Sequence, residues 1–302
     1  MTTIFELADK ADVDGIREML ATNPAARDLH DEQGRSPLLR AAFAGRGPAF
    51  EAILEAGEPT DPWDRLIGGC ADGLPAPDAW SPDGFTPLHL AAFVDNVPAA
   101  SALLEAGADP NATADMYGAP ATTMAMLLSS CHPAQAGVQS ALAETLLDAG
   151  AAIEGALMTA LSYGYLDVAR TLVRRGARVD SLPAAAGLGR LDDAARMLPS
   201  ADAEERHRAL ALAALHGHVD VVRMLLDAGE DPNRYNPKGN HAHSTPLHQA
   251  VLAGHEAVVR LLVERGARLD IKDTVYGGTP LGWAIYGKQD TIARHLQQAS
   301  AP

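Results

Sequence analysis

The sequence predicts an all-α solenoid, in which similar helix–turn–helix units stack along one axis. A short motif, Thr-Pro-Leu-His, begins at Thr86 and recurs at Thr245, with a shorter Thr-Pro-Leu copy at Thr279. A second motif opens on Gly-His and closes on leucines and a glycine, at residues 217–229 and 254–266. Motifs separated by 279 − 245 = 34 residues indicate repeats rather than one globular core.

The composition favours many thin helix–helix interfaces. Of the 302 residues, 47% are hydrophobic but only 5% are aromatic, and alanine is abundant. Alanine stabilises helices and lets them approach closely. A large core built on aromatic side chains is therefore not expected.

Each part of the repeat has a mechanical reason. The threonine caps the first helix, and the proline follows in its first turn, where a missing N–H costs nothing. Gly-His reverses the chain between two antiparallel helices. The closing glycine, as in Gly107 and Gly266, ends the second helix in the left-handed region. Polar residues such as 109–111 then lead into a hairpin finger that reaches the next unit.

These motifs resemble the signature of the ankyrin-repeat family, and the resemblance extends over nearly the whole chain. It implies one solenoid over residues 1–302, with about nine units, cap repeats at 1–35 and 279–302, and a concave binding face. It also implies that the framework histidines hydrogen-bond backbone groups across repeats. These are His89 and His248 in the first motif, and His218 and His255 in the second.

The repeat pattern breaks in identifiable places. Residues 58–82 form a degenerate repeat, in which 63–69 is expected to be a stunted helix before a proline-rich stretch. The middle repeats lose their fingers after Gly150 and Gly176, whereas residues 231–244 form a long finger. Short fingers between long ones predict a notch in the concave wall, although drift in loop length explains the same pattern.

The charge balance limits the classes of partner that the chain is expected to bind. Twenty-four basic and thirty-nine acidic residues give a net charge of 24 − 39 = −15. Nucleic acids and anionic membranes are recognised by clustered Lys and Arg, so both are disfavoured. Basic or neutral protein partners remain.

The sequence also indicates a compartment. The N-terminus lacks a signal peptide, and no apolar run is long enough to span a membrane. Cys70 and Cys131 form no Cys-x-x-Cys pair, so a reducing cytoplasm is expected, with no disulfide framework or zinc knuckle. We expect a monomer, and the alanine-rich, lysine-poor usage suggests a GC-rich bacterial source.

Candidate binding residues follow from the framework, because finger residues and the positions before each turn face the groove. Tyrosine and tryptophan are favoured there because they bury a large area in a contact. The fingers offer Trp80, Asp83, Phe85, Tyr117, Tyr235, His241, His243 and Tyr276. The groove positions are Phe43, Phe93, Val94, Tyr163, Leu215, His216, Leu252 and Tyr286. For Phe43 and Phe93, a place in the seam between repeats is an equal alternative.

Motifs that carry catalysis are scarce. The chain has no nucleophile elbow, phosphate-binding loop, His-Glu-x-x-His or Gly-x-Gly-x-x-Gly. Cys131 lies beside a His-Pro pair, but without a positioned base its thiol stays protonated. The favoured interpretation is a protein-interaction module that needs no cofactor and is not an enzyme.

Two alternatives stay open. The first is a small-molecule-binding protein or metal-dependent enzyme that uses the notch near residues 231–244. If that finger is extended, His241 and His243 face the same side, where His216 with oxygens of Asp231 and Tyr235 would complete a zinc-type site. The second is an antitoxin-like or immunity-like partner whose acidic surface masks a basic protein.

Overall fold

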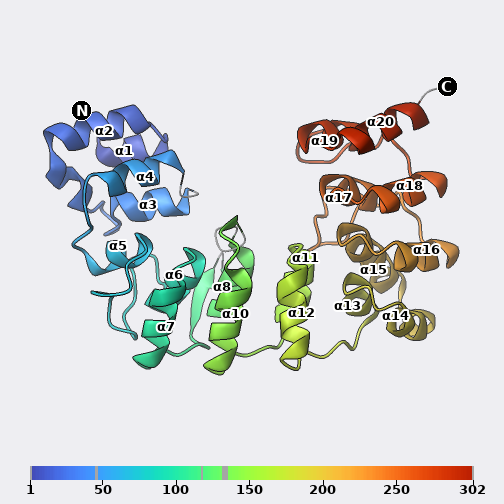
Figure 1. Ribbon diagram of the computed structural model, residues 1–302, viewed down its shortest axis with the longest axis horizontal. Coiled ribbons are helices and arrows are strands. Elements are labelled where there is room, and N and C mark those ends of the chain that lie inside the picture. The colour runs from blue at the N-terminus through green and yellow to red at the C-terminus, as the bar shows by residue number, and fades with distance from the viewer. Residues whose placement is uncertain (1, 45–46, 117, 131–134, 301–302) are drawn as a thin grey trace. The chain divides into compact units, whose positions relative to one another are not determined.

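The computed structural model describes residues 2–44, 47–116, 118–130 and 135–300. Its contacts divide the chain into two compact units, Met1–Ile153 and Glu154–Pro302 (Figure 1). Within the described residues, nine antiparallel helix pairs and one single helix follow one another. The predicted all-α repeat fold is confirmed.

The first unit stacks its helices in two layers. Its first layer consists of α1 (Ile4–Asp9), α3 (Pro37–Phe43), α5 (Pro62–Ile67), α6 (Pro87–Phe93) and α8 (Thr123–Ser129). Its second layer consists of α2 (Val13–Thr22), α4 (Pro48–Glu55), α7 (Val97–Glu105) and α10 (Gln139–Asp148), and the 3-10 helix η1 (Pro24–Asp28) follows α2. Each first-layer helix packs on the next one along the chain.

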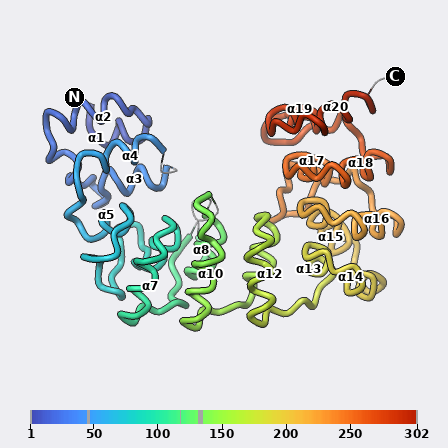
Figure 2. Tube along the Cα trace, viewed as in Figure 1, coloured from blue at the N-terminus to red at the C-terminus, as the bar shows by residue number. Residues whose placement is uncertain are grey.

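The second unit repeats this arrangement (Figure 2). Its first layer is α11 (Ala156–Ser162), α13 (Leu182–Gly187), α15 (Ala203–Leu215), α17 (Pro246–Leu252) and α19 (Pro280–Tyr286). Its second layer is α12 (Leu166–Arg174), α14 (Leu191–Met197), α16 (Val219–Asp227), α18 (Glu256–Glu264) and α20 (Asp290–Ala299), and the 3-10 helix η2 (Leu198–Ser200) follows α14. From α13 to α20, mainly leucine, valine and alanine side chains between the layers form one buried cluster. In the described part of the chain, no helix has both the length and the apolar character needed to cross a bilayer.

The expected caps begin and end the helices. The hydroxyls of Ser36, Thr86 and Thr279 each accept the backbone N–H three residues ahead, with proline in the first turn. Gly107 and Gly266, which end second helices, have φ angles of 92° and 86°. These left-handed angles favour glycine, because a Cβ would clash there.

The framework histidines connect neighbouring repeats. His89 Nε2 lies 3.2 Å from the carbonyl oxygen of Ala121, and His248 Nε2 lies 3.2 Å from that of Gly278. His218 Nε2 and His255 Nε2 lie 3.0 and 2.9 Å from the carbonyl oxygens of Gly187 and Leu215. The predicted cross-repeat hydrogen bonds are confirmed.

The fingers differ in structure. Between α7 and α8 the finger is an antiparallel hairpin of β1 (Thr113–Met116) and β2 (Ala119–Thr122), in which Thr113 pairs with Thr122. The long finger, residues 231–244, contains turns and no strand. An asparagine at the base of each finger binds the following repeat: Asn111 Nδ2 donates to Gly150 O (3.0 Å), and Asn233 Nδ2 donates to Gly266 O (3.2 Å).

Two helices that lie between other repeats, α5 and α13, have only six residues each, as does the N-terminal α1. Residues 58–82 contain α5 and no second helix, and the following chain is irregular. Side chains of the flanking repeats meet across both short helices. The Phe43 and Phe93 rings are 5.2 Å apart across α5, and His216 Nε2 reaches the Leu161 carbonyl oxygen (2.9 Å) across α13.

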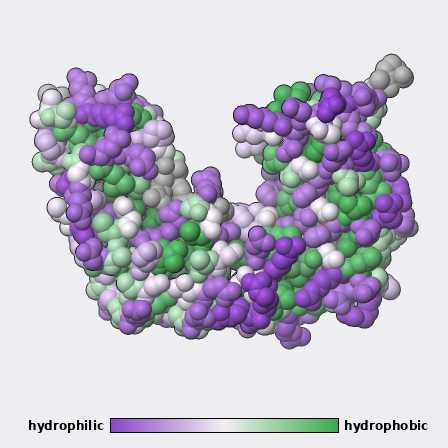
Figure 3. Space-filling view, in the orientation of Figure 1, coloured by the Kyte–Doolittle hydropathy of each residue, from purple (hydrophilic) through white to green (hydrophobic). Residues whose placement is uncertain are grey.

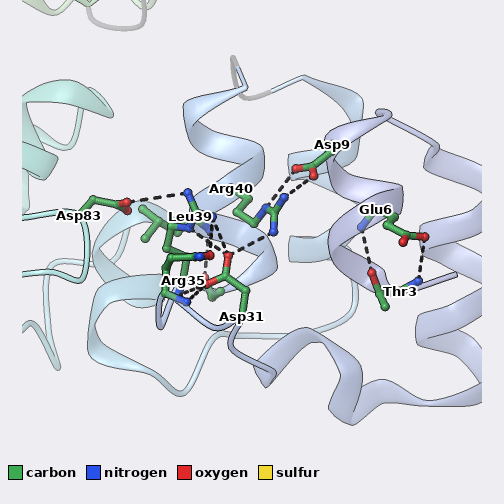
Figure 4. A network of polar contacts seen from close by, with 10 residues as sticks. Thr3, Glu6, Asp9, Asp31, Arg35, Leu39, Arg40 and Asp83 are labelled. Carbon is green, nitrogen blue, oxygen red and sulfur yellow. Dashed lines mark hydrogen bonds and ion pairs between the residues drawn. The ribbon is translucent and has the colours of Figure 1, made fainter. Parts of the chain in front are cut away.

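A network of charged residues joins the first repeats (Figure 4). Asp31 accepts hydrogen bonds from the guanidinium groups of Arg35 (2.9 Å) and Arg40 (3.1 Å). Arg40 also pairs with Asp9 and lies over the ring of Phe5, 5.4 Å from its centroid. Arg35 in turn lies 4.0 Å from Asp83. Shared ion pairs of this kind fix the geometry better than an isolated surface pair.

Candidate functional site

Two adjoining cavities lie in the second unit. The larger, here called the aromatic pocket, has a volume of about 570 Å³ and is lined by His241, His243, Gln249, Tyr276, Trp283 and Tyr286 among others. The smaller, here called the histidine pocket, has about 350 Å³ and includes Leu215, His216 and His255. Gln249 and Leu252 line both cavities, so the two lie next to each other.

Four successive elements supply the aromatic pocket. The long finger contributes His241 and His243, α17 contributes Gln249 and Leu252, the next finger contributes Tyr276, and α19 contributes Trp283 and Tyr286. Tyr276 and Tyr286 are 81% and 85% exposed. Large aromatic side chains therefore project from a helical framework without protein contacts over most of their surface.

The long finger is not extended at His241, so the condition on which the metal site depended is not met. His241 has φ 54°, and Ser244 N donates to His241 O at 3.0 Å, which closes a turn over residues 241–244. The turn still brings the two imidazoles together, with ring centroids 6.1 Å apart, and both line the aromatic pocket. The chain folds back instead of extending, because the left-handed residue reverses its direction.

The rings around His243 stand at different angles. The Tyr276 ring is nearly perpendicular to it (87°, 6.4 Å between centroids), and the Trp283 ring is tilted (35°, 5.8 Å). Trp283 Nε1 donates to Asp273 Oδ2 at 2.9 Å. This hydrogen bond fixes the indole plane against the pocket.

Asp273 is a buried carboxylate directly behind the pocket wall. Besides Trp283, the backbone N–H groups of Val275, Tyr276 and Gly278 donate to it at 2.9, 2.6 and 2.7 Å. Burial raises its pKa, but these hydrogen bonds outweigh burial and hold the pKa of the carboxyl well below its usual range. Asp273 is therefore ionised at neutral pH.

Gln249 contributes an unpaired acceptor. Its side chain is only 3% exposed, and its Nε2 donates to Ser244 Oγ at 2.7 Å. The Ser244 hydroxyl donates its single proton to His241 O (3.0 Å), so toward Gln249 it can only accept a hydrogen bond. The side of the Gln249 amide that faces Ser244 must therefore be the nitrogen. Gln249 Oε1 then has no hydrogen-bond partner among the described residues, although the side chain lines both pockets.

The structure does not bring the predicted metal ligands together. His216 Nε2 is committed to the Leu161 carbonyl oxygen, and burial lowers the His216 pKa to about 4. Tyr235 Oη donates to Lys272 O (2.6 Å), and Asp231 Oδ1 accepts from Asn233 N (2.9 Å). No group of three or more His, Cys, Asp or Glu in the described ranges is arranged to hold a metal ion.

The predicted residues of the first unit, as far as the structure describes them, line neither of these two pockets. Phe43 contacts the rings of Phe85 (6.1 Å) and Phe93 (5.2 Å) and remains 40% exposed. Trp80 is 55% exposed, and Asp83 lies near Arg35. Val94 is buried, so its predicted place in the groove was wrong. Tyr117 and Cys131 lie outside the described residues.

In the second unit, two other predicted residues, Tyr163 and Tyr235, are not among the residues that line the two pockets. Tyr163 is 49% exposed and stacks on Tyr165, with centroids 6.1 Å apart. Tyr235 is 42% exposed and holds the two fingers together through its hydroxyl.

Sequence reasoning missed Gln249 and Trp283. Both occupy the position after the fourth residue of the motif, where the copy at Thr86 has the buried Leu90. A polar amide and an indole at the position that holds the buried Leu90 in the copy at Thr86 were the available signal.

Comparisons with known proteins agree with the repeat. A family model described as ankyrin repeats (3 copies) matches residues 142–236 and 210–301, and a single ankyrin-repeat model matches 83–115. Ankyrin repeat and SAM domain-containing protein 6 of Mus musculus is 35% identical over 111 residues, which are 37% of this chain and 12% of that protein.

Two further relatives have names that do not mention ankyrin repeats. Inactive serine/threonine-protein kinase TEX14 of Mus musculus is 38% identical over 89 residues, 30% of this chain and 6% of that protein. Protein PhlB of Serratia liquefaciens is 35% identical over 84 residues, 28% of this chain and 35% of that protein. The matched stretches thus span a minor part of each relative.

What these proteins share with the chain is the repeat itself. Ankyrin repeats generally act as protein–protein interaction modules. Matched by the family model over residues 142–301 and built from the same capped helix pairs, this chain belongs to the ankyrin-repeat family.

Proposed function

We propose that the chain binds a segment of a protein partner, and that the segment lies across the aromatic and histidine pockets of the second unit. The observation that carries this proposal is the aromatic pocket, a cavity of about 570 Å³ beside two tyrosines that are more than four-fifths exposed. Exposed apolar and aromatic surface around a cavity marks interaction sites, because isolated soluble proteins rarely keep such patches.

The surroundings support a protein segment as the occupant. Leu252, Val275 and Ile285 are also exposed near the tyrosines, and Figure 3 shows hydrophobic surface where α17 and α19 lie. Tyrosine and tryptophan are enriched among residues that dominate protein binding energies. Trp283 and Tyr286 lie on a helix, and Tyr276 lies in a hydrogen-bonded turn. Their backbone is already ordered in the free protein, so binding a partner costs little backbone entropy.

A peptide-display library tests the proposal on the full chain. Random peptides are selected on the wild-type protein and then measured on a Tyr276→Ala, Tyr286→Ala double variant. Trp80→Ala is the matched control, because Trp80 is an exposed aromatic residue of the first unit. We expect selected peptides to lose at least about tenfold in affinity on the double variant, a loss of ~1.4 kcal/mol, and to keep it on the control.

Two results contradict the proposal. One is that no peptide is enriched above empty support. The other is that the enriched peptides bind the double variant as tightly as the wild type.

A further inference from the structure

We propose that the aromatic pocket takes a cationic side chain of the partner, an arginine, whose guanidinium group contacts the aromatic rings and donates a hydrogen bond to Gln249 Oε1. This inference rests on the proposed function and specifies the chemistry of the partner residue. Three independent features of the pocket lead to it.

The first feature is the unpaired acceptor on α17. Gln249 is almost completely buried, its amide orientation is fixed by Ser244, and its Oε1 has no partner among the described residues. This oxygen is not one of the buried unpaired atoms of the described residues, so it is open to the pocket, where an occupant that donates an N–H can bond it. A purely apolar occupant would cover the oxygen without giving it a hydrogen bond.

The second feature is the aromatic wall. Tyr276, Trp283 and Tyr286 surround the cavity, and the perpendicular arrangement of Tyr276 and His243 presents ring faces in more than one direction. The faces of aromatic rings carry negative partial charge and attract cations, arginine above all, since its flat guanidinium also stacks.

The third feature is the charge at the pocket. The ionised Asp273 carboxylate lies behind Trp283 and Gly278, two residues that line the cavity. No lysine or arginine is among the described residues that line it. The pocket therefore has an uncompensated negative charge nearby and no resident cation to compete with a ligand.

The same features disfavour other occupants. A carboxylate or phosphate group would face ring faces, an unpaired carbonyl oxygen and the Asp273 charge, all of which repel anions. An aliphatic side chain would match the rings but not Gln249. Among protein side chains, arginine satisfies all three features at once, because it combines charge, a planar surface and several N–H donors.

Three blocked peptides separate these contributions. Their sequence is Gly-Gly-X-Gly-Gly, with arginine, its uncharged isostere citrulline, or norleucine at X. Each is titrated into the ¹⁵N-labelled full chain while the indole N–H resonance of Trp283 is followed, identified by its loss in Trp283→Phe. This resonance reports on the pocket because the same N–H bonds to Asp273.

We expect a saturable shift in the millimolar range for arginine, which corresponds to about −4 kcal/mol. Citrulline is expected to bind at least about fivefold more weakly, since it lacks the attraction of a cation to the rings, ~1 kcal/mol. Norleucine is expected to be weaker than citrulline, because it cannot donate to Gln249.

Substitutions test the residues assigned to each contribution. Gln249→Leu, which places the residue found at Leu90 in the other copy of the motif, should weaken arginine and citrulline but not norleucine. Tyr286→Leu should weaken arginine, whereas Tyr286→Phe keeps the ring and should not. Tyr163→Leu is the matched control, because Tyr163 is exposed in the same unit without lining the pocket.

The inference is overturned if norleucine binds as tightly as arginine, if arginine causes no saturable shift, or if Gln249→Leu and Tyr286→Leu leave arginine binding unchanged. In each case peptides selected from the display library can still bind the pockets. Failure of the arginine preference is thereby distinguished from failure of the proposed function.

Discussion

Copies of the first motif begin at Thr86, Thr245 and Thr279, and a looser copy, Ser-Pro-Leu-Leu, begins at Ser36. The position after the fourth residue of these copies holds Leu90, Gln249, Trp283 and Arg40, respectively. Arg40 joins the charged network of the first repeats, and Leu90 is buried in the core. Gln249 and Trp283 instead line the aromatic pocket. One backbone position therefore supplies structure in some repeats and the candidate site in others, because its first-layer helix places it at the edge of the stack.

Truncation of a core leucine should lower the stability of the fold strongly, whereas truncation of a pocket tyrosine should hardly change it. Leu225 is fully buried, so Leu225→Ala should lower the free energy of unfolding by ~2–5 kcal/mol through lost contacts and a cavity. Tyr286 is 85% exposed, so Tyr286→Ala should change it by no more than about 0.5 kcal/mol. Urea denaturation measures both, and a tyrosine variant as unstable as the leucine variant would place Tyr286 in the core.

Asp64 should give the first unit a stability that rises as the pH falls. Burial raises the pKa of this carboxyl to about 6, from 3.8, although a hydrogen bond from Ser36 lowers it. Between these values the folded state binds more protons than the unfolded state, so stability decreases as the pH rises from about 4 to 6. Each unit of pKa difference corresponds to about 1.4 kcal/mol.

Asp64→Asn removes the titrating group and keeps an acceptor for Ser36. The variant should therefore be more stable than the wild type at pH 7 and nearly equal to it at pH 4. Chemical denaturation of both proteins across this range is the measurement, and a wild-type slope retained in the variant would exclude Asp64 as its source.

At the scale of the elements, α13 illustrates how a short helix brings distant repeats into contact. Its residues 184–187 are three alanines and a glycine, all buried, and a Cβ on Gly187 would lie 3.1 Å from Leu161 Cδ1. Small side chains allow α11 to approach, and this approach lets His216 reach the Leu161 carbonyl.

Enlarging this position should separate the two repeats. We expect Gly187→Val to destabilise the second unit by ~1–3 kcal/mol, because the neighbouring leucine must move. As His216 loses its buried place, its pKa should rise from about 4 towards the ordinary 6.5. Proton NMR titration of the imidazole tests this. Gly282→Val is the control, because Gly282 is an exposed helical glycine where an added Cβ would meet only Thr279 Oγ1, at 3.7 Å. An unchanged His216 pKa in Gly187→Val would argue against the bridge.

Amide exchange should differ between regular and irregular repeats. Residues 58–80 contain only α5 and irregular chain, whereas residues 210–262 contain helices with neighbours on both sides. Because local opening is easiest where few contacts hold the backbone, we expect faster exchange across 58–80. Equal protection of the two stretches would show that the degenerate repeat is as firmly held as the regular ones.

At the scale of the whole molecule, the two units should respond differently to acid. In the second unit, burial lowers the pKa of His207, His216, His218, His241 and His248. These rings stay neutral in the folded state, so their contribution is complete above pH 6.5 and is lost as the pH falls below it. In the first unit burial lowers the pKa of one histidine, His89, in the same way, and Asp64 acts in the opposite direction.

Acidification from pH 7 to 5 should therefore open the second unit before the first. Hydrogen exchange read out by mass spectrometry, corrected for the intrinsic effect of pH, distinguishes peptides of residues 2–153 from those of 154–300. Protection lost first from the first unit would contradict the assignment of these histidines as buried neutral groups.

The sequence was sufficient for the framework and insufficient for the pocket. Caps at Thr86 and Thr279 and the turn at Gly217-His218 depend on local chemistry, so their structure was predictable. The pocket depends on how a finger folds, and the residue type of His241 does not predict its left-handed conformation. Likewise, Gln249 acquires its unpaired oxygen only because Ser244 takes its amide nitrogen, a contact that needs the folded turn.

The glycine and histidine of the second motif form the turn within a repeat and also make contacts between neighbouring repeats. A Cβ at Gly189 or Gly217 would lie 2.6 Å from the imidazole of His218 or His255 in the following repeat. The repeat with Gly217-His218 therefore leaves room for the His255 ring of its successor and places its own ring beside Gly189 of its predecessor. The order of these repeats along the chain is therefore fixed by the contacts between them. If two repeats were exchanged, a histidine ring would meet a repeat without room for it, or the room beside a glycine would stay unfilled, even though each repeat kept its own sequence.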